Sequence, residues 1–166
     1  AAIGRKGSVR MVGAGSGVTG SRSCSMRERS AGGSSIRPFG VGLVVLLVLD
    51  FVWLGLLMAG FYRRGLGHIA RTAEDGSLSP VWPAAVPVYL LIVAGLLLFA
   101  LARPGAHTVG GAAVAGALFG LIAYGIYDFT NLSTLRDYPL QLAVVDILWG
   151  TFLCGMTAAA MRWASP

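Results

Sequence analysis

The sequence predicts an all-α integral membrane protein, an up-down-up-down four-helix bundle that follows a disordered N-terminal tail. Charged residues make up 12% of the chain and its mean hydropathy is +0.73, whereas about a quarter of the residues of a soluble domain are charged. The apolar residues form four blocks, each long enough for an α-helix to cross about 30 Å of hydrocarbon. The connections between the blocks are short, which makes neighbouring helices antiparallel. The blocks cover residues 39–62, 82–102, 108–127 and 140–162.

Residues 1–37 are predicted to form a disordered tail, separate from the four-helix membrane domain of residues 38–166. This segment is rich in Gly, Ser and Arg, and it has no hydrophobic periodicity. Such a composition cannot bury enough apolar surface to offset the entropy lost on ordering. Met11 and Met26 both lie inside the tail, and both are candidate starts of translation.

The basic residues are unevenly placed, which indicates an orientation in a membrane and not nucleic-acid binding. Seven of the thirteen Lys and Arg residues precede the first block. With the N-terminus inside, nine basic residues would face the cytoplasm and four would face the outside. Twelve Arg against one Lys, with heavy use of Ala, Gly and Val, hints at a bacterial source. We therefore expect a multi-pass protein of the bacterial inner membrane, with both termini cytoplasmic and the lipid bilayer as its main partner.

The third and fourth blocks carry ridges of small residues that predict close helix packing. In each block the small residues are spaced four apart, as in the GxxxG pattern of membrane helices. Packing the two antiparallel ridges together would bring Asp128 and Asp146 to the same end of a hairpin. The predicted packing residues are Gly116, Gly120, Gly150 and Cys154.

Polar residues inside the apolar blocks predict an interior pocket. Asp50 lies near the middle of the first block, where an ionised carboxylate costs about 2.5–3.5 kcal/mol to insert. We therefore expect Asp50 to face the bundle interior, together with other polar and aromatic side chains on inward helix faces. The predicted pocket residues are Asp50, Trp53, Tyr124, Tyr127, Asp128, Thr130, Asn131, Asp146 and Trp149.

Five strings lie within or next to the apolar blocks: Asp50-Phe-Val-Trp53-Leu-Gly55, Phe61-Tyr62, Gly116-Ala-Leu-Phe-Gly120-Leu, Tyr124-Gly-Ile-Tyr-Asp128-Phe-Thr-Asn131-Leu-Ser-Thr and Asp146-Ile-Leu-Trp149-Gly150. Together they resemble the bacterial membrane proteins of the domain-of-unknown-function 2177 family. The resemblance covers about residues 39–162, and its specific part is Tyr127-Asp-Phe-Thr-Asn131, with Phe129 and Ser133 where Leu and Ala are expected. It implies a four-helix membrane protein without an assigned activity.

Three classes of function remain open. The favoured one is a small binding or transport module, for which a homo-oligomer is expected because four helices are few for a carrier. The second is a structural or regulatory subunit, whose polar cluster only locks helix packing through hydrogen bonds worth about 0.6–2 kcal/mol each. The third is an intramembrane enzyme acting on a lipid, which is disfavoured because no known catalytic or metal-binding motif is present. The sequence identifies no catalytic residue, metal site or cofactor.

Overall fold

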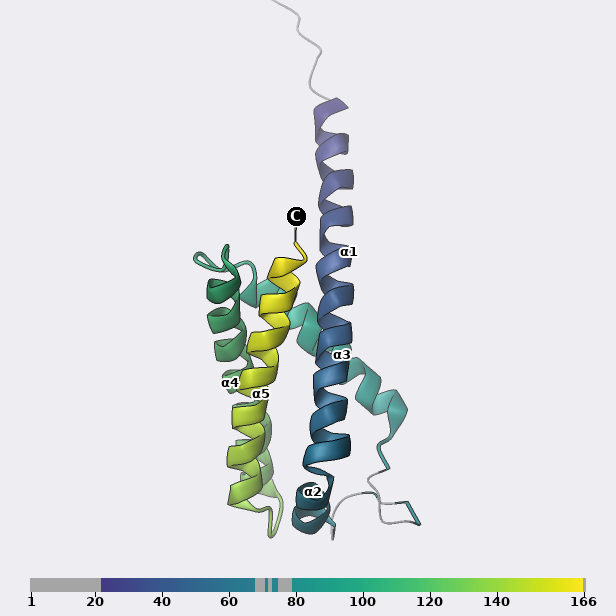
Figure 1. Cartoon of the computed structure of the whole chain (residues 1–166), viewed down its shortest axis with the longest axis vertical. Coiled ribbons are helices and arrows are strands. Elements are labelled where there is room, and N and C mark those ends of the chain that lie inside the picture. Colours follow the sequence, from purple (N-terminus) through teal and green to yellow (C-terminus); the bar gives the residue numbers. More distant parts are fainter. Residues whose placement is uncertain (1–21, 68–70, 72, 75–78, 166) are drawn as a thin grey trace, which may run out of the picture.

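Helices make up all the regular structure in the part of the chain that the structure describes (Figure 1). The computed structural model describes residues 22–67, 71, 73–74 and 79–165, with side chains from residue 35 onward. The segments η1 and η2 are π-helical turns that continue α1 and α3. The elements are α1 (Arg22–Phe51), η1 (Val52–Leu57), α2 (Ala59–Leu66), α3 (Trp82–Gly95), η2 (Leu96–Ala100), α4 (Val109–Thr134) and α5 (Leu140–Trp163).

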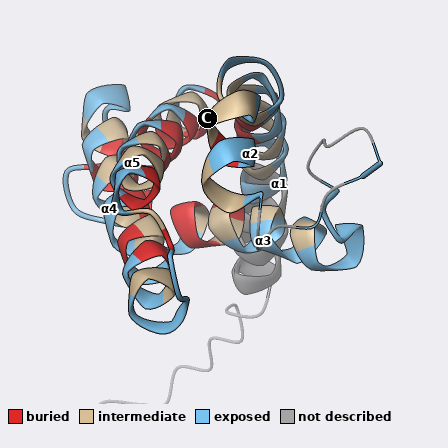
Figure 2. Ribbon diagram, turned by 90° about the horizontal axis from the view of Figure 1, so that it is seen from below, coloured by how far each residue is buried: buried red, intermediate tan, exposed pale blue. Residues whose placement is uncertain are grey.

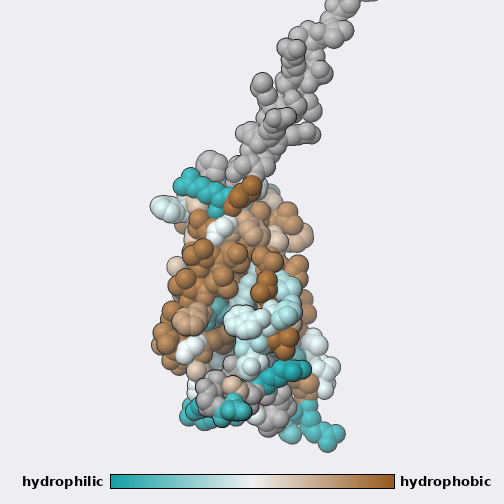
Figure 3. All heavy atoms as spheres, turned by 90° about the vertical axis from the view of Figure 1, so that its right-hand side faces the viewer, coloured by the Kyte–Doolittle hydropathy of each residue, from teal (hydrophilic) through white to brown (hydrophobic). Residues whose placement is uncertain are grey.

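Four helical segments are long and apolar enough to span a membrane, which confirms the predicted all-α membrane fold. In Figure 3 a belt of hydrophobic residues lies between more hydrophilic ends, as expected for a chain that crosses hydrocarbon. Helices suit this setting because they satisfy backbone hydrogen bonds within each segment. The four segments are Ser35–Leu57, Trp82–Ala100, Val109–Thr134 and Leu140–Trp163.

Helix α1 begins earlier than the first apolar block. It starts at Arg22, so residues 22–37 are helical where the sequence predicts part of the disordered tail. Once a helix is nucleated, each further residue adds one hydrogen bond at a low entropic cost. A polar segment can therefore extend a helix whose apolar part is anchored elsewhere. Residues 1–21, the rest of the predicted tail, lie outside the described residues.

The predicted ends of the first and third helices are also displaced. The first helical run breaks at Met58, where the backbone has φ −118° and ψ 7°, and the chain restarts as α2. Helix α4 continues to Thr134 and not to residue 127. The hydroxyls of Ser133 and Thr134 donate to the carbonyl of Thr130 at 2.8 and 2.7 Å. Such local bonds satisfy polar side chains without breaking the helix.

Helices α4 and α5 pack most closely, through the small residues that the sequence singles out. A Cβ added at Gly116 would lie 2.5 Å from the Cβ of Ala158, and one added at Gly120 would lie 2.8 Å from the Cβ of Cys154. The added atom at Gly120 would also collide with the carbonyl oxygen of Gly150. Because no side chain larger than hydrogen fits at these positions, glycine permits the two backbones to approach.

Helix α1 runs antiparallel to α5, and α2 reaches the start of α5. Gly42 lies against Met161, whereas Gly65 of α2 lies against Leu142. Helix α3 is tilted relative to the other long helices in Figure 1. Buried residues gather on the inward-facing sides of the helices, as Figure 2 shows. This arrangement places α2 and the α4–α5 connection at one end of the molecule.

Replacing glycine by alanine should separate a packed position from an open one on the same helix. Gly120→Ala should lower the free energy of unfolding by about 1–3 kcal/mol through overpacking against α5. Gly125→Ala is the matched control because a Cβ there meets nothing within 4 Å. It should be neutral or stabilise the protein by up to about 1 kcal/mol through helix propensity. Denaturant titration of the purified variants in mixed micelles measures both changes, and equal effects would contradict the packing described.

Candidate functional site

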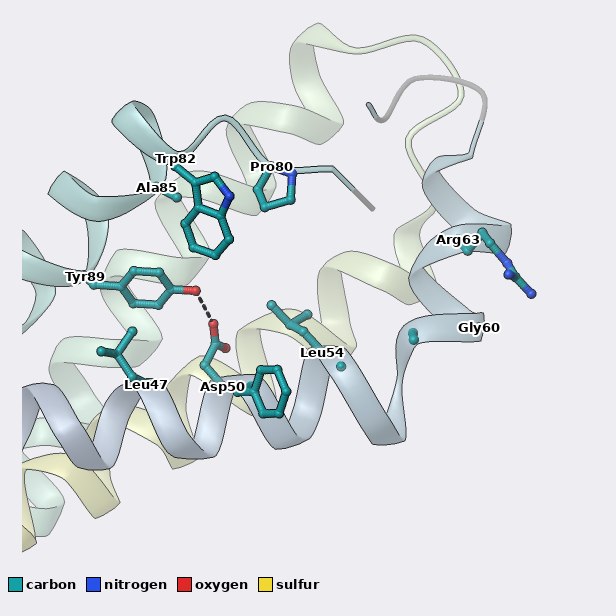
Figure 4. A pocket seen from close by; sticks show the side chains of 12 residues that line it. Leu47, Asp50, Leu54, Gly60, Arg63, Pro80, Trp82, Ala85 and Tyr89 are labelled. Atoms are coloured by element: carbon teal, nitrogen blue, oxygen red, sulfur yellow. Dashed lines mark hydrogen bonds between the residues drawn. The ribbon is translucent and has the colours of Figure 1, made fainter. Parts of the chain in front are cut away.

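Asp50 connects three helices through hydrogen bonds from aromatic side chains. It is 8% exposed and lies in α1 directly before the π-helical segment η1. Its Oδ2 accepts a hydrogen bond from the hydroxyl of Tyr89 in α3 at 2.7 Å (Figure 4). Its Oδ1 accepts one from the indole nitrogen of Trp149 in α5 at 3.3 Å. One carboxyl group thus ties α1 to both α3 and α5.

A second carboxyl group, that of Asp146, is linked to the first through two indoles. The hydroxyl of Tyr62 in α2 donates to Oδ1 of Asp146. Trp53 donates its indole N–H to the Tyr62 oxygen at 3.4 Å, and its ring stacks on Trp149 with centroids 4.2 Å apart. Burial and the nearby carboxylate of Asp146 raise the pKa of Tyr62 far above its usual range. The Tyr62 hydroxyl therefore stays a neutral donor at physiological pH.

Asp128 is the third carboxyl group, and it is 0% exposed. Its Oδ1 accepts a hydrogen bond from the hydroxyl of Tyr138 at 2.8 Å. Its Oδ2 is buried without a partner. Burial and this hydrogen bond raise the pKa of Tyr138, which lies in the connection between α4 and α5. Tyr138 therefore joins that connection to the side of α4.

The three sites share one chemical pattern, in which a tyrosine donates to a carboxyl group. Neutral hydroxyl and indole donors satisfy carboxyl oxygens without cancelling a negative charge. Among the described residues, no Arg or Lys pairs with these three carboxyl groups. Within the same residues, no group of His, Cys, Asp and Glu side chains could hold a metal ion.

A cavity of about 580 Å³ lies between the α1–η1–α2 segment and the start of α3. Figure 4 shows Asp50 and Tyr89 at one end of it, and Arg63 at the other end with its side chain directed away. Most of the remaining wall is apolar. The lining residues are Leu47, Asp50, Phe51, Leu54, Gly55, Ala59, Gly60, Arg63, Pro80, Trp82, Ala85 and Tyr89.

The structure places the predicted pocket residues in several different environments. Only Asp50 lines the cavity, whereas Trp53, Trp149 and Asp146 lie in the adjoining hydrogen-bonded and stacked network. The ring of Tyr124 lies against Gly150.

The remaining predicted residues belong to α4. Asp128 accepts a hydrogen bond from Tyr138, and Asn131 is half-buried. Tyr127 is 59% exposed, and Thr130 is exposed in a shallow groove on the outer side of α4. These two side chains are not brought together with Asp50. A helix turns by about 100° per residue, so Tyr127 and Asp128 necessarily face different directions.

The residues that sequence reasoning missed are the three tyrosines that donate to the carboxyl groups. One of them ends the first apolar block, one lies in the first turns of the second block, and one comes two residues before the fourth block. The available signal was chemical: a buried carboxyl group needs donors, and tyrosine is one of the few neutral side chains that supply one. The sequence does not show which tyrosine meets which aspartate. The donors are Tyr62, Tyr89 and Tyr138.

A comparison with protein families finds a match over residues 36–163 to a family described as "Predicted membrane protein (DUF2177)". The match covers most of the chain. It includes all four membrane-spanning segments, apart from Ser35 at the start of the first one. Searches of curated proteins and of solved structures find no match.

Removing a donor hydroxyl should weaken the bundle at the position where the carboxyl group loses its partner. Tyr62→Phe should lower the free energy of unfolding by about 0.6–2 kcal/mol, the usual worth of a hydrogen bond between membrane helices. Tyr127→Phe removes the same hydroxyl from an exposed site and should have no measurable effect. Unfolding in mixed micelles compares the two variants, and an unchanged Tyr62→Phe protein would show that this bond is not formed in solution.

Proposed function

We propose that this chain, which belongs to the DUF2177 family of predicted membrane proteins, binds a small, mainly apolar molecule within the bilayer. The observation that carries the proposal is the cavity of about 580 Å³ with the carboxyl group of Asp50 at its inner end. Ligand sites in proteins are concave and mostly apolar, with a few polar groups that fix orientation, and they typically enclose about 300–1,000 Å³.

The position of the cavity suits a ligand that dissolves in the membrane. Its walls come from the apolar spans α1 and α3 and from the short helix α2. Trp82 lines it at the first residue of α3, and tryptophan is favoured at the boundary between hydrocarbon and headgroups. A molecule with a hydrocarbon body could therefore enter laterally while its polar group reaches Asp50.

Binding is the step common to transport and to regulation by a ligand. Either role is compatible with an intramembrane carboxyl and aromatic site. Transport would require a pathway to both sides of the membrane, and four spans make a homo-oligomer the expected form of such a carrier. Binding is therefore the function to test first.

A structural role is the second candidate, and a specific observation favours it. Asp128 and Asp146 lie outside the cavity, and each accepts a hydrogen bond from a tyrosine of another element. For these two residues, hydrogen bonds that fix one element against another account for the geometry without a ligand. Asp50 differs because it lines the cavity as well as joining helices.

We further propose a bacterial inner-membrane location with both termini in the cytoplasm. In Figure 1 the start of α1, the connection from α3 to α4 and the end of α5 lie at one end of the molecule. Arg162 Nη2 donates to the carbonyl of Leu101 at 3.5 Å, which keeps two of these segments together. The basic residues are more numerous at this end, as the positive-inside rule requires of a cytoplasmic face.

Photolabelling should locate a hydrophobic ligand in the cavity. A long-chain alkyl alcohol carrying a diazirine, added to the protein in phosphatidylcholine nanodiscs, should label peptides from α1 and the start of α3. Ala85→Trp should strongly reduce this labelling because it fills the cavity with an indole. Mass spectrometry of the digested protein measures the labelled positions.

The matched control places the same indole on α3 outside the cavity. Val88 is exposed and does not line the cavity, so Val88→Trp should leave the labelling unchanged. Uniform labelling of all lipid-facing surfaces, with no effect of Ala85→Trp, would contradict binding at this place.

A further inference from the structure

We infer that the molecule bound in this cavity carries a cationic nitrogen on a hydrocarbon chain, and that the nitrogen pairs with the carboxylate of Asp50. This inference rests on the proposed function and names the chemical class of its ligand. It is carried by the charge, the free acceptor positions and the aromatic lining around Asp50.

The charge of the cavity favours a cation. Asp50 is its single acidic lining residue, and its described partners are the neutral donors Tyr89 and Trp149. Arg63 also lines the cavity, but it lies at the opposite end and is directed outward in Figure 4. A carboxylate in hydrocarbon is costly unless it is paired, and attraction between charges is stronger there than in water. An organic cation would supply the missing countercharge.

The acceptor positions of Asp50 are only half occupied. An ionised carboxylate offers about four lone-pair sites on its two oxygens. Tyr89 donates to Oδ2 and Trp149 donates to Oδ1, one bond to each oxygen. The bond from Tyr89 comes from within the cavity, as Figure 4 shows. Lone pairs therefore remain for a ligand, and the two bonds already formed hold the carboxylate in one orientation.

The lining around Asp50 fits the rest of such a ligand. Phe51, Tyr89 and Trp82 contribute aromatic rings, whose faces attract ammonium groups. Leu47 and Leu54 add aliphatic wall along α1 and η1, suitable for a hydrocarbon chain. The combination favours an alkylamine or a quaternary alkylammonium ion. A fatty-acid carboxylate would instead meet Asp50 with like charge.

Competition against the neutral photoprobe tests the inference. The competitors are an alkyltrimethylammonium ion, an alcohol and a carboxylate of equal chain length, added to the full chain in zwitterionic phosphatidylcholine nanodiscs. The ammonium ion should displace the probe at a concentration about tenfold lower than the alcohol, a difference of about 1.4 kcal/mol. The carboxylate should be the weakest competitor of the three.

Substitution of Asp50 identifies the source of this preference. Asp50→Asn should bring the ammonium ion to the level of the alcohol in the same variant, because the charge that distinguishes the two competitors is lost. Asp137→Asn is the control because it removes the same charge from an exposed residue of the α4–α5 connection. Asp137 has φ 62°, a conformation that asparagine tolerates, so this variant should keep the full preference.

The outcomes separate the inference from the function on which it rests. Equal competition by ammonium and alcohol in the unchanged protein overturns the cationic ligand and leaves hydrophobic binding intact. A preference that persists in Asp50→Asn also overturns it, because the attraction would then come from elsewhere. Absence of competition by every compound overturns the proposed function itself. The comparison in the unchanged protein decides the question even if Asp50→Asn does not fold.

Discussion

A carboxyl group inside hydrocarbon must find hydrogen-bond donors, and here aromatic side chains supply them. Each of the three membrane aspartates accepts a bond from a tyrosine, and Asp50 accepts a second one from Trp149. Because donor and acceptor come from different elements, each bond fixes the position of one element against another. The bonds join α1 to α3 and α5, α2 to α5, and the α4–α5 connection to α4. Neutral donors leave any negative charge uncompensated, which makes Asp50 a suitable partner for a cation.

Helix packing determines where that charge is accessible. Glycines on α4 allow α5 to approach closely. Helix α3 is tilted relative to α1 (Figure 1), and the cavity lies between these two segments. After the π-helical segment η1 the helix breaks at Met58, and α2 then lies against the start of α5. The first residues of α2 also line one end of the cavity. Helices α4 and α5 thus form the closely packed part of the bundle, whereas α1, η1, α2 and the start of α3 line the cavity.

The sequence predicts the spans well because block length and hydropathy follow directly from bilayer thickness. It also singles out Asp50, Asp128 and Asp146, since carboxyl groups are rare in hydrocarbon. It predicts an interior pocket but not the place or the lining of the cavity, because the tilt of α3 depends on side-chain packing among helices that are distant in sequence. Nor does it predict the partner tyrosines: Tyr62 reaches Asp146 only because the helix breaks at Met58. The expectation that polar and aromatic side chains lie on inward helix faces also puts Tyr127 and Thr130 in the pocket, whereas both are exposed on α4.

The central claim is that aromatic donors hold the intramembrane carboxyl groups, and a double-mutant cycle on Asp50 and Tyr89 tests it most directly. The free energy of unfolding is measured for the unchanged protein, Asp50→Ala, Tyr89→Phe and the double variant. Hydrogen bonding between the two side chains predicts a coupling energy of about 0.6–2 kcal/mol. The same cycle with the exposed Tyr127 in place of Tyr89 should give none. Strictly additive effects of Asp50→Ala and Tyr89→Phe would contradict the account.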